Sequence, residues 1–283
     1  MPSDRLSLSS DVLTAVEKRL NCIEALLPKL EAELLAFQKK GYRTNTKSNS
    51  FDLVTEADLH SEKVLVDTIE KHFPSDAILS EESYEANPAS EDITWVIDPI
   101  DGTVNYANAM HHWGISIAIC YQHKPVAGIV SAPALNLKYK AIAGCGATKN
   151  GRPISVSDKK ALKQGVICTG FPYDRAHRAE PLSRALANML KVAGGVRRLG
   201  AASLDFCLVA DSTLIGYYEM QLKPWDMAAG LIIAEEAGAK ITDFNGKLVH
   251  FMTSHGVVVA NPSVHQELLP LTAPMLDAIA VHP

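Results

Sequence analysis

Apolar side chains recur every three or four residues along the first predicted helix, residues 11–40. This spacing places them on one face of an α-helix, and Gly41 is typical of a residue that ends a helix. The apolar positions are Val12, Val16, Leu20, Ile23, Leu27, Leu30, Leu34 and Phe37. The pattern therefore predicts a long amphipathic helix at the start of the chain.

The next segment, residues 42–51, is polar, and we interpret it as a loop whose Lys47 faces either solvent or a site. A second helix is predicted from Thr55 to about His72. Its start is marked by Thr55 and Asp58, which have the spacing of a capping box. Capping alone would account for an acid at Asp58.

Short apolar runs separated by turn residues predict strands in the middle of the chain. One run, residues 95–97, is expected to end at Pro99 and Gly102, and Asn150-Gly151 is a strong hairpin signal. The strands predicted in this part are residues 77–80, 95–97, 113–121, 126–132 and 138–143.

Helices and strands alternate in the remainder of the chain. Strands are predicted at residues 165–169, 196–199, 215–220, 240–243 and 257–260, and helices at 181–192, 203–210, 224–237 and after Pro262. An antiparallel sheet followed by this alternation predicts an α/β (α+β) fold, with two layered sheets and helices outside and between them. We expect a single unit over residues 1–283, with closely packed halves at 10–160 and 161–283.

The composition excludes several classes of protein. Of the 283 residues, 47% are hydrophobic and 21% are charged, and no apolar stretch approaches the ~20 residues of a membrane span. The net charge of −5 argues against a general nucleic-acid binder, and we interpret Arg197-Arg198 as a solvated edge. The five cysteines form no Cys-x-x-Cys pair, and the first residues lack the layout of a secretory signal. We expect a cytoplasmic protein with reduced cysteines, and no nucleic acid or membrane among its partners.

The segment Asp98-Pro99-Ile100-Asp101-Gly102-Thr103 is the most informative part of the sequence. An apolar strand delivers two carboxylates to its carboxyl end, where α/β sheets commonly place ligands. Ile100 puts a backbone carbonyl between them, Gly102 lets the chain approach a ligand closely, and Thr103 adds a hydroxyl and an N–H. Such oxygens suit Mg²⁺ or Mn²⁺ better than Zn²⁺. The alternative is an acidic turn at the surface, which fits poorly with two acids directly after a buried strand.

Further acids gain meaning beside this segment. Glu81-Glu82 follows the predicted strand 77–80, although a Glu pair alone is usually a solvated loop. Asp226 lies in the first turn of a predicted helix, where an acid is favoured in any case. The residues by themselves leave the roles of Glu81, Asp226 and Asp58 open.

Four segments, taken in order, resemble the signature motifs of the inositol monophosphatase family. They are Asp-Leu-Val-Thr-Glu-Ala-Asp at 52–58, Ser-Glu-Glu-Ser at 80–83, Trp-Val-Ile-Asp-Pro-Ile-Asp-Gly-Thr-Val-Asn-Tyr at 95–106 and Lys-Pro-Trp-Asp-Met-Ala-Ala-Gly at 223–230. The similarity spans roughly residues 12–270. The resemblance implies a layered α-β-α-β-α sandwich of the inositol monophosphatase and fructose-bisphosphatase type.

The resemblance also implies a set of site residues. Two or three Mg²⁺ ions, or Mn²⁺ as an alternative, would be bound by Glu81, Asp98, the Ile100 carbonyl, Asp101 and Asp226. Catalysis would fall to Asp58, Glu81 and Thr103, of which Asp58 and Thr103 orient and help deprotonate the attacking water. Substrate contacts are implied for Asp101, Gly102, Thr103, Gly200, Ala201, Ala202, Glu219 and Asp226.

The implied activity is Mg²⁺-dependent hydrolysis of a small phosphorylated polyol or sugar, with inositol 1-phosphate the leading candidate. No covalent intermediate is required, and the resemblance implies lithium sensitivity and a homodimer. Bisphosphate nucleotidase, histidinol phosphatase and fructose-1,6-bisphosphatase activities are alternatives. The nucleotidase branch usually has Lys-Glu-Phe after Asp-Gly-Thr, whereas this chain has Val104-Asn105-Tyr106.

A catalytically silent protein that uses metals to hold a phosphorylated ligand is the alternative of another class. Such a protein is expected to lack a metal ligand or a water-activating residue, and this chain lacks none of those implied. One departure concerns the substrate, because many relatives have Thr or Ser where this chain has Ala201. Asp205 has no assigned role.

Overall fold

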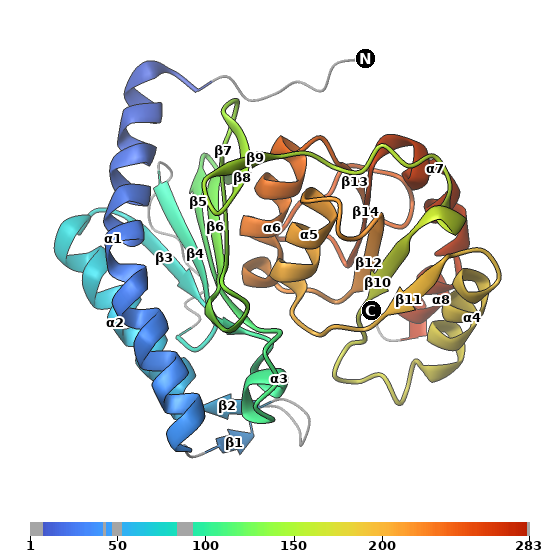
Figure 1. Ribbon diagram of the computed structural model, residues 1–283, viewed down its shortest axis with the longest axis horizontal. Coiled ribbons are helices and arrows are strands. Elements are labelled where there is room, and N and C mark those ends of the chain that lie inside the picture. Colours follow the sequence, from blue (N-terminus) through green and yellow to red (C-terminus); the bar gives the residue numbers. More distant parts are fainter. Residues whose placement is uncertain (1–7, 42–43, 47–52, 84–92, 282–283) are drawn as a thin grey trace.

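The computed structural model describes residues 8–41, 44–46, 53–83 and 93–281, and it consists of alternating layers of helix and sheet (Figure 1). One outer layer comprises α1 (Ser10–Lys40) and α2 (Glu56–His72). The middle layer comprises α5 (Ala202–Ala210) and α6 (Pro224–Glu236). The other outer layer comprises α4 (Ala179–Leu190), α7 (Pro262–Leu271) and α8 (Pro274–Val281). A sheet lies on each side of the middle layer. The predicted α-β-α-β-α sandwich is therefore confirmed.

The first sheet has seven strands in the order β3-β4-β5-β6-β7-β8-β9. All neighbours in it are antiparallel except β3 and β4, which are parallel. Its strands are β3 (Ala77–Ser80), β4 (Ile93–Asp101), β5 (Gly114–Tyr121), β6 (Lys124–Ala132), β7 (Leu137–Ile142), β8 (Gly146–Lys149) and β9 (Arg152–Ile154). The Asn150-Gly151 hairpin lies between β8 and β9, as predicted, with both residues at positive φ.

The second sheet has five strands in the order β11-β10-β12-β14-β13. β11, β10 and β12 are parallel, and β14 is antiparallel to both β12 and β13. The strands are β10 (Val166–Thr169), β11 (Gly195–Arg197), β12 (Gly216–Met220), β13 (Lys240–Thr242) and β14 (Gly256–Ala260). Helix α6 contacts strands of both sheets, so it joins the two halves of the core.

The ends of the first two helices follow the sequence closely. Gly41 ends α1 at a positive φ of 84°, which favours glycine. Thr55 caps α2 in a complete capping box with Asp58. The buried face of α1 consists of the predicted residues Val16, Leu20, Ile23, Leu27, Leu30 and Leu34.

Strand β4 differs from its prediction in a way that matters for the site. The sequence predicts an end at Pro99, but the strand continues to Asp101, with an irregular register against β5 between Asp98 and Asp101. A bulge of this kind re-aims side chains and tolerates a proline that donates no hydrogen bond. The carbonyl of Pro99 accepts a hydrogen bond from the Ser61 hydroxyl at 2.9 Å.

Three smaller differences concern elements that the sequence did not predict. Part of the expected loop 42–51 forms β1 (Thr44–Thr46), which pairs with β2 (Leu53–Thr55), whereas Lys47 lies outside the described residues. A short helix, α3 (Thr103–Ala107), follows Gly102. The single helix expected after Pro262 is two helices, because Pro274 starts α8 and disfavours helical backbone just before it.

Two hydrophobic clusters fill the space between the layers, and the rings of Trp95 and Trp113 in the first cluster are both fully buried. All five cysteines are free, and only Cys145 among them is exposed. No helix among the described residues has the length and apolar character needed to cross a bilayer.

Candidate active site

Three carboxylates from distant parts of the chain converge at the end of β4. Asp98 and Asp101 stand on the bulged end of this strand, and Asp226 lies in the first turn of α6. One oxygen of each lies within 4.8 Å of the others. Asp98 and Asp101 are buried and Asp226 is half-buried. The fold thus brings together three of the five metal ligands that the resemblance implies.

The other two implied ligands border this group. Glu81 directly follows β3, which runs parallel to β4 and ends at the same edge of the sheet. Its side chain hydrogen-bonds with Asp98, and its charge acts on both Asp98 and Asp226. The Ile100 carbonyl accepts a hydrogen bond from the Thr103 hydroxyl at 3.1 Å.

Burial raises the pKa of each acid in the group, and repulsion by other members of the group raises it further for Asp98 and Asp226. For Asp98, burial raises the pKa well above its usual range, and the charges of Glu81, Asp101 and Asp226 raise it further. For Asp226 the causes are burial and then Asp101 and Glu81, whereas burial raises the pKa of Asp101 to about 6 against hydrogen bonds from Ser203. Within the described ranges, no basic side chain forms an ion pair with these three aspartates. Crowded, buried acids without a counter-charge are the electrostatic signature of a cation site.

Asp58 caps α2 and also faces the acidic group. The Thr55 backbone N–H donates to its Oδ2 at 2.8 Å, and the Thr103 hydroxyl lies 3.1 Å from its Oδ1. Burial raises the pKa of Asp58 to about 6, with a smaller contribution from the charge of Glu81. Both interpretations of Asp58 that the sequence left open therefore hold geometrically, since one oxygen caps the helix and the other meets Thr103.

Asp101 joins the two halves of the molecule. Its carboxylate accepts hydrogen bonds from the Ala202 N–H at 3.0 Å, the Ser203 N–H at 2.8 Å and the Ser203 hydroxyl at 2.5 Å. It thereby caps the first turn of α5, where backbone N–H groups have no partner within the helix. The Ala202 amide, which the resemblance offers to the substrate, is thus bound to Asp101.

Gly102 lies where the two halves approach most closely. Its φ of +89° is in the left-handed region, and a Cβ there would stand 3.1 Å from the Ala201 Cβ and 3.2 Å from the His112 carbonyl oxygen. Both the conformation and the space therefore require glycine. Ala201 is buried beside this glycine, and the carbonyl oxygen of Gly200, itself at positive φ, would lie 3.1 Å from the same Cβ.

Asn105 and Asp205 are two further side chains that connect the two halves of the molecule beside Gly102, and the local sequence gave no sign of either role. The Asn105 side-chain amide donates to the His112 carbonyl at 2.6 Å and to the Leu199 carbonyl at 2.7 Å. Buried Asp205 lies 3.2 Å from the His112 ring nitrogen Nε2. Asn105 and Leu199 are 94 residues apart, and His112 and Asp205 are 93 residues apart, so only the tertiary fold reveals these two contacts.

Glu219 stands near the end of β12, on the side of the site formed by the second sheet. Its Oε2 accepts a hydrogen bond from the Tyr217 hydroxyl at 2.6 Å. Burial raises the pKa of Glu219 to about 8, with Asp205 and Asp101 acting in the same direction. The charge of Arg198 opposes this shift and lowers the pKa of Glu219. Arg198 is exposed, as predicted, but it lies close enough to Glu219 for its charge to act on that carboxyl.

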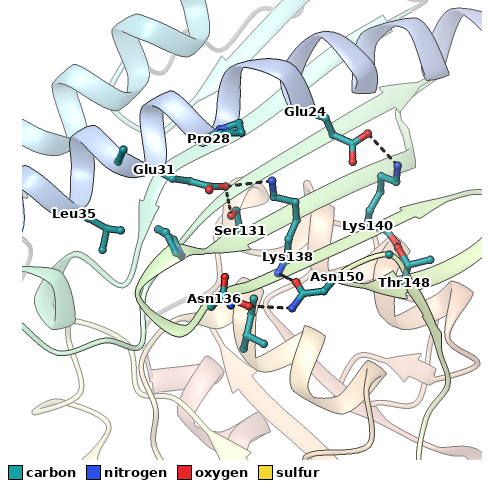
Figure 2. A pocket seen from close by; sticks show the side chains of 14 residues that line it. Glu24, Pro28, Glu31, Leu35, Ser131, Asn136, Lys138, Lys140, Thr148 and Asn150 are labelled. Atoms are coloured by element: carbon teal, nitrogen blue, oxygen red, sulfur yellow. Dashed lines mark hydrogen bonds and ion pairs between the residues drawn. The ribbon is translucent and has the colours of Figure 1, made fainter.

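A separate cleft of about 500 Å³ lies between α1 and strands of the first sheet (Figure 2). Its carboxylates face lysines, with Glu24 at 3.0 Å from Lys140 and Glu31 at 3.4 Å from Lys138. Glu31 also accepts a hydrogen bond from the Ser131 hydroxyl at 2.6 Å. None of the residues expected to act in catalysis or binding lines this cleft.

Comparison with known proteins identifies the class to which this site belongs. The family model described as "Inositol monophosphatase family" matches residues 10–276. The chain therefore belongs to the inositol monophosphatase family, as the four motifs indicated. Among curated proteins it is 35% identical over 237 residues to the inositol-1-monophosphatase of Synechocystis, covering 84% of this chain and 82% of that protein. It is 37% identical over 217 residues to the Nus factor SuhB of Vibrio cholerae, covering 77% of this chain and 81% of the relative.

Solved structures show the same fold. An IMPase from Thermotoga maritima superposes with a TM-score of 0.84 at 32% identity, covering 94% of this chain and 100% of that one. An IMPase/NADP phosphatase solved with Mg²⁺ and phosphate superposes with a TM-score of 0.80 at 25% identity, covering 91% of this chain and 95% of that one.

Proposed function

We propose that the protein is a Mg²⁺-dependent phosphatase that hydrolyses a small phosphate monoester, with inositol 1-phosphate the leading candidate. The observation that carries this proposal is the buried group of Asp98, Asp101 and Asp226, whose mutual repulsion no ion pair offsets within the described residues. A phosphate monoester is itself a dianion, so carboxylates alone would repel it. A site of this composition binds such a substrate only when cations reverse its local charge.

The donor set fits Mg²⁺, because it consists of carboxylates and a backbone carbonyl. Two or three ions would be held by Asp98, Asp101 and Asp226, with Glu81 and the Ile100 carbonyl beside them. When bound, Mg²⁺ offsets the negative charge, acidifies water and stabilises the leaving oxygen of the ester. The Mg²⁺ and phosphate in the IMPase/NADP phosphatase structure support this choice of ion, with Mn²⁺ as the alternative.

Asp58 and Thr103 would remove a proton from the attacking water. The Thr103 hydroxyl lies 3.1 Å from Asp58 Oδ1, so its proton can pass to Asp58 as the hydroxyl oxygen takes one from water. Asp58 suits the role of a general base because one of its oxygens caps α2 while the other faces the Thr103 hydroxyl. The Ile100 carbonyl, also 3.1 Å from this hydroxyl, is the alternative acceptor of its single proton.

The remaining residues would bind the substrate. The Gly102 and Thr103 backbone N–H groups would hold the phosphate, a role supported by their position at the start of α3 directly after the acidic strand. Gly200, Ala201 and Ala202 would contact the rest of the substrate. Glu219 would accept hydrogen bonds from hydroxyl groups of the polyol, which favours hydroxylated substrates over simple ones.

A phosphate-release screen with Mg²⁺ tests this function. The panel contains inositol 1-phosphate, histidinol phosphate, fructose 1,6-bisphosphate and 3′-phosphoadenosine 5′-phosphate. We expect the highest kcat/KM for inositol 1-phosphate. A preference of tenfold or more for the nucleotide, about 1.4 kcal/mol in transition-state binding, would instead assign the nucleotidase activity and leave the metal chemistry intact.

A second candidate function is a phospholigand-binding or factor role without turnover. It is favoured by one observation, the name Nus factor carried by relatives such as that of Vibrio cholerae. The absence of phosphate release from every ester, together with Mg²⁺-dependent binding of inositol 1-phosphate, would support it.

Millimolar lithium inhibition and a homodimer also belong to the proposed phosphatase function. Assays in LiCl against matched NaCl test the first, and light scattering against the 30.6 kDa monomer mass tests the second.

A further inference from the structure

Glu219 and Gly170 are neighbours across the second sheet. The parallel register of β10 and β12 pairs Cys168 with Tyr217 and Thr169 with Tyr218. The next residues of the two strands, Gly170 and Glu219, therefore stand beside each other at the carboxyl edge of the sheet. Glu219 is half-buried there, on the side that faces the acidic group.

The carboxyl of Glu219 occupies the space that a side chain at residue 170 would need. A Cβ on Gly170 would lie 1.9 Å from Cδ, Oε1 and Oε2 of Glu219. Real Cβ atoms essentially never come within 3.0 Å of a heavy atom that belongs to a residue other than their chain neighbours. The φ of Gly170 lies outside the left-handed region, so its backbone would accept other residues. The three Glu219 atoms are the far end of a flexible side chain, so a residue with a Cβ at position 170 would displace the Glu219 carboxyl rather than the backbone.

Tyr217 fixes the same carboxyl from a second direction. Its hydroxyl donates to Oε2 at 2.6 Å, and its ring is fully buried and packs edge-on against Phe206, with 5.2 Å between the centroids. Tyr217 and Glu219 are two residues apart on one strand, so their side chains share a face of the sheet. No described residue donates a hydrogen bond to Oε1, so this oxygen is available to a hydroxyl of the substrate.

We propose that Gly170 and Tyr217 are specificity-determining positioning residues, which hold the Glu219 carboxyl so that Oε1 meets a hydroxyl of the substrate. This inference rests on the proposed function, because Glu219 is a substrate contact only there. The Glu219 carboxyl is bound by the Tyr217 hydroxyl on one side and lies against the Gly170 backbone on the other. Its position is therefore set by the protein rather than by the substrate. Substrates whose hydroxyl does not reach Oε1 lose this hydrogen bond, and the buried acceptor stays unpaired.

A double-mutant cycle tests the inference with Gly170→Ala, Glu219→Ala and the combined variant. Gly170→Ala is expected to lower kcat/KM for inositol 1-phosphate by about tenfold or more, since displacements near 1 Å have effects of that order. The loss for p-nitrophenyl phosphate, which has no hydroxyl to meet, should be several times smaller. In the Glu219→Ala background the added methyl group has room, so Gly170→Ala should cost less than about twofold. Equal losses with and without the Glu219 carboxyl, or on both substrates, would overturn the inference.

Gly165→Ala is the matched control. Gly165 immediately precedes β10, and a Cβ there would meet the Ile215 side chain at 2.6 Å in the hydrophobic core. This variant should melt at a lower temperature but change kcat/KM for the two substrates by the same factor. Tyr217→Phe keeps the ring and removes only the donor. It is expected to raise KM for inositol 1-phosphate more than it lowers kcat.

A crystal structure of Gly170→Ala separates this inference from the proposed function. The inference requires the Glu219 carboxyl to leave its position beside the Tyr217 hydroxyl, whatever the substrate is. A carboxyl that stays within hydrogen-bond distance of Tyr217 would refute the positioning role. Failure of the wild-type protein to hydrolyse any ester would refute the proposed function without changing this structural result.

Discussion

The acidic group at the end of β4 and the cleft beside α1 hold carboxylates in opposite surroundings. In the cleft, Glu24 and Glu31 each face a lysine, so the charges of its lining neutralise one another (Figure 2). In the acidic group, Asp98, Asp101 and Asp226 face one another, and their pKa values rise. Carboxylates that have no basic partner among the described residues indicate a cation site, whereas a cleft lined by ion pairs does not, whatever its volume.

The largest expected effect is on activity when the acidic group loses a member. Asp98→Asn should lower Mg²⁺-dependent turnover by more than the roughly 10–100-fold typical of residues that only support metal ligands. The reason is that Asp98 stands between Glu81, Asp101 and Asp226. Glu31→Gln in the cleft is the control and should keep near-normal turnover. Retention of turnover by folded Asp98→Asn would remove the metal assignment.

Asp58→Asn is the next prediction, and it separates catalysis from helix capping. Turnover should fall by roughly 10²–10⁴-fold, the usual contribution of a general base, because an amide does not accept the proton. Thr55→Ala removes the hydroxyl that caps α2 and also donates to Asp58 Oδ2, but it keeps the Asp58 carboxylate beside Thr103. It should cost about 0.5–2 kcal/mol of stability and far less turnover than Asp58→Asn. If both variants lose the same small fraction of turnover, Asp58 has only its structural role.

The third prediction concerns stability against pH without metal. The pKa values of Asp58 and Asp101 rise from 3.8 to about 6 on folding. The folded state therefore binds protons more tightly than the unfolded state, and its stability is greatest below pH 4 with respect to these groups. That contribution is lost as pH rises from about 4 to about 6, so Tm in EDTA should carry a falling contribution over this window. Saturating Mg²⁺ should remove this contribution. The same pH dependence of Tm in EDTA and in saturating Mg²⁺ would contradict the prediction.

The smallest expected effect is in the cleft. Lys138→Met removes the partner of Glu31 in a half-exposed ion pair, and such pairs contribute about 0–1 kcal/mol. The free energy of unfolding, measured in urea, should change by no more than that. A larger loss would show that the cleft ion pairs matter as much as the buried acids and would weaken the comparison.

The elements of the fold were predictable because most depend on local signals. The capping box of Thr55 and Asp58, the stop at Gly41 and the turn at Asn150-Gly151 act over a few residues, and each stands as predicted. Strand β4 was predicted too short, since its bulge depends on pairing with β5 and on the carbonyl of Pro99 meeting Ser61. Neither contact leaves a mark in the local sequence.

The candidate site divides in the same way. Two acids directly after an apolar strand suggested a metal site from the residues alone, and the family motifs added Asp226 and Glu81. Other contacts of the site join residues far apart along the chain. They are the capping of α5 by Asp101, the hydrogen bond from Asn105 to Leu199 and the packing of the Glu219 carboxyl against Gly170. Spacing along a chain carries no information on such contacts, because they arise from how the two sheets pack.

Isothermal titration calorimetry with MgCl₂ tests the central claim most directly, namely that the acidic group is a cation site. Metal-free wild-type protein, Asp98→Asn and Lys138→Met are titrated at one pH near neutrality, in two buffers of different ionisation enthalpy. The account predicts that wild type and Lys138→Met bind Mg²⁺ equally and release protons, because the raised pKa values leave part of the group protonated. Asp98→Asn should bind at least about tenfold more weakly. Equal Mg²⁺ binding by Asp98→Asn and wild type, or no binding by wild type, would contradict the account.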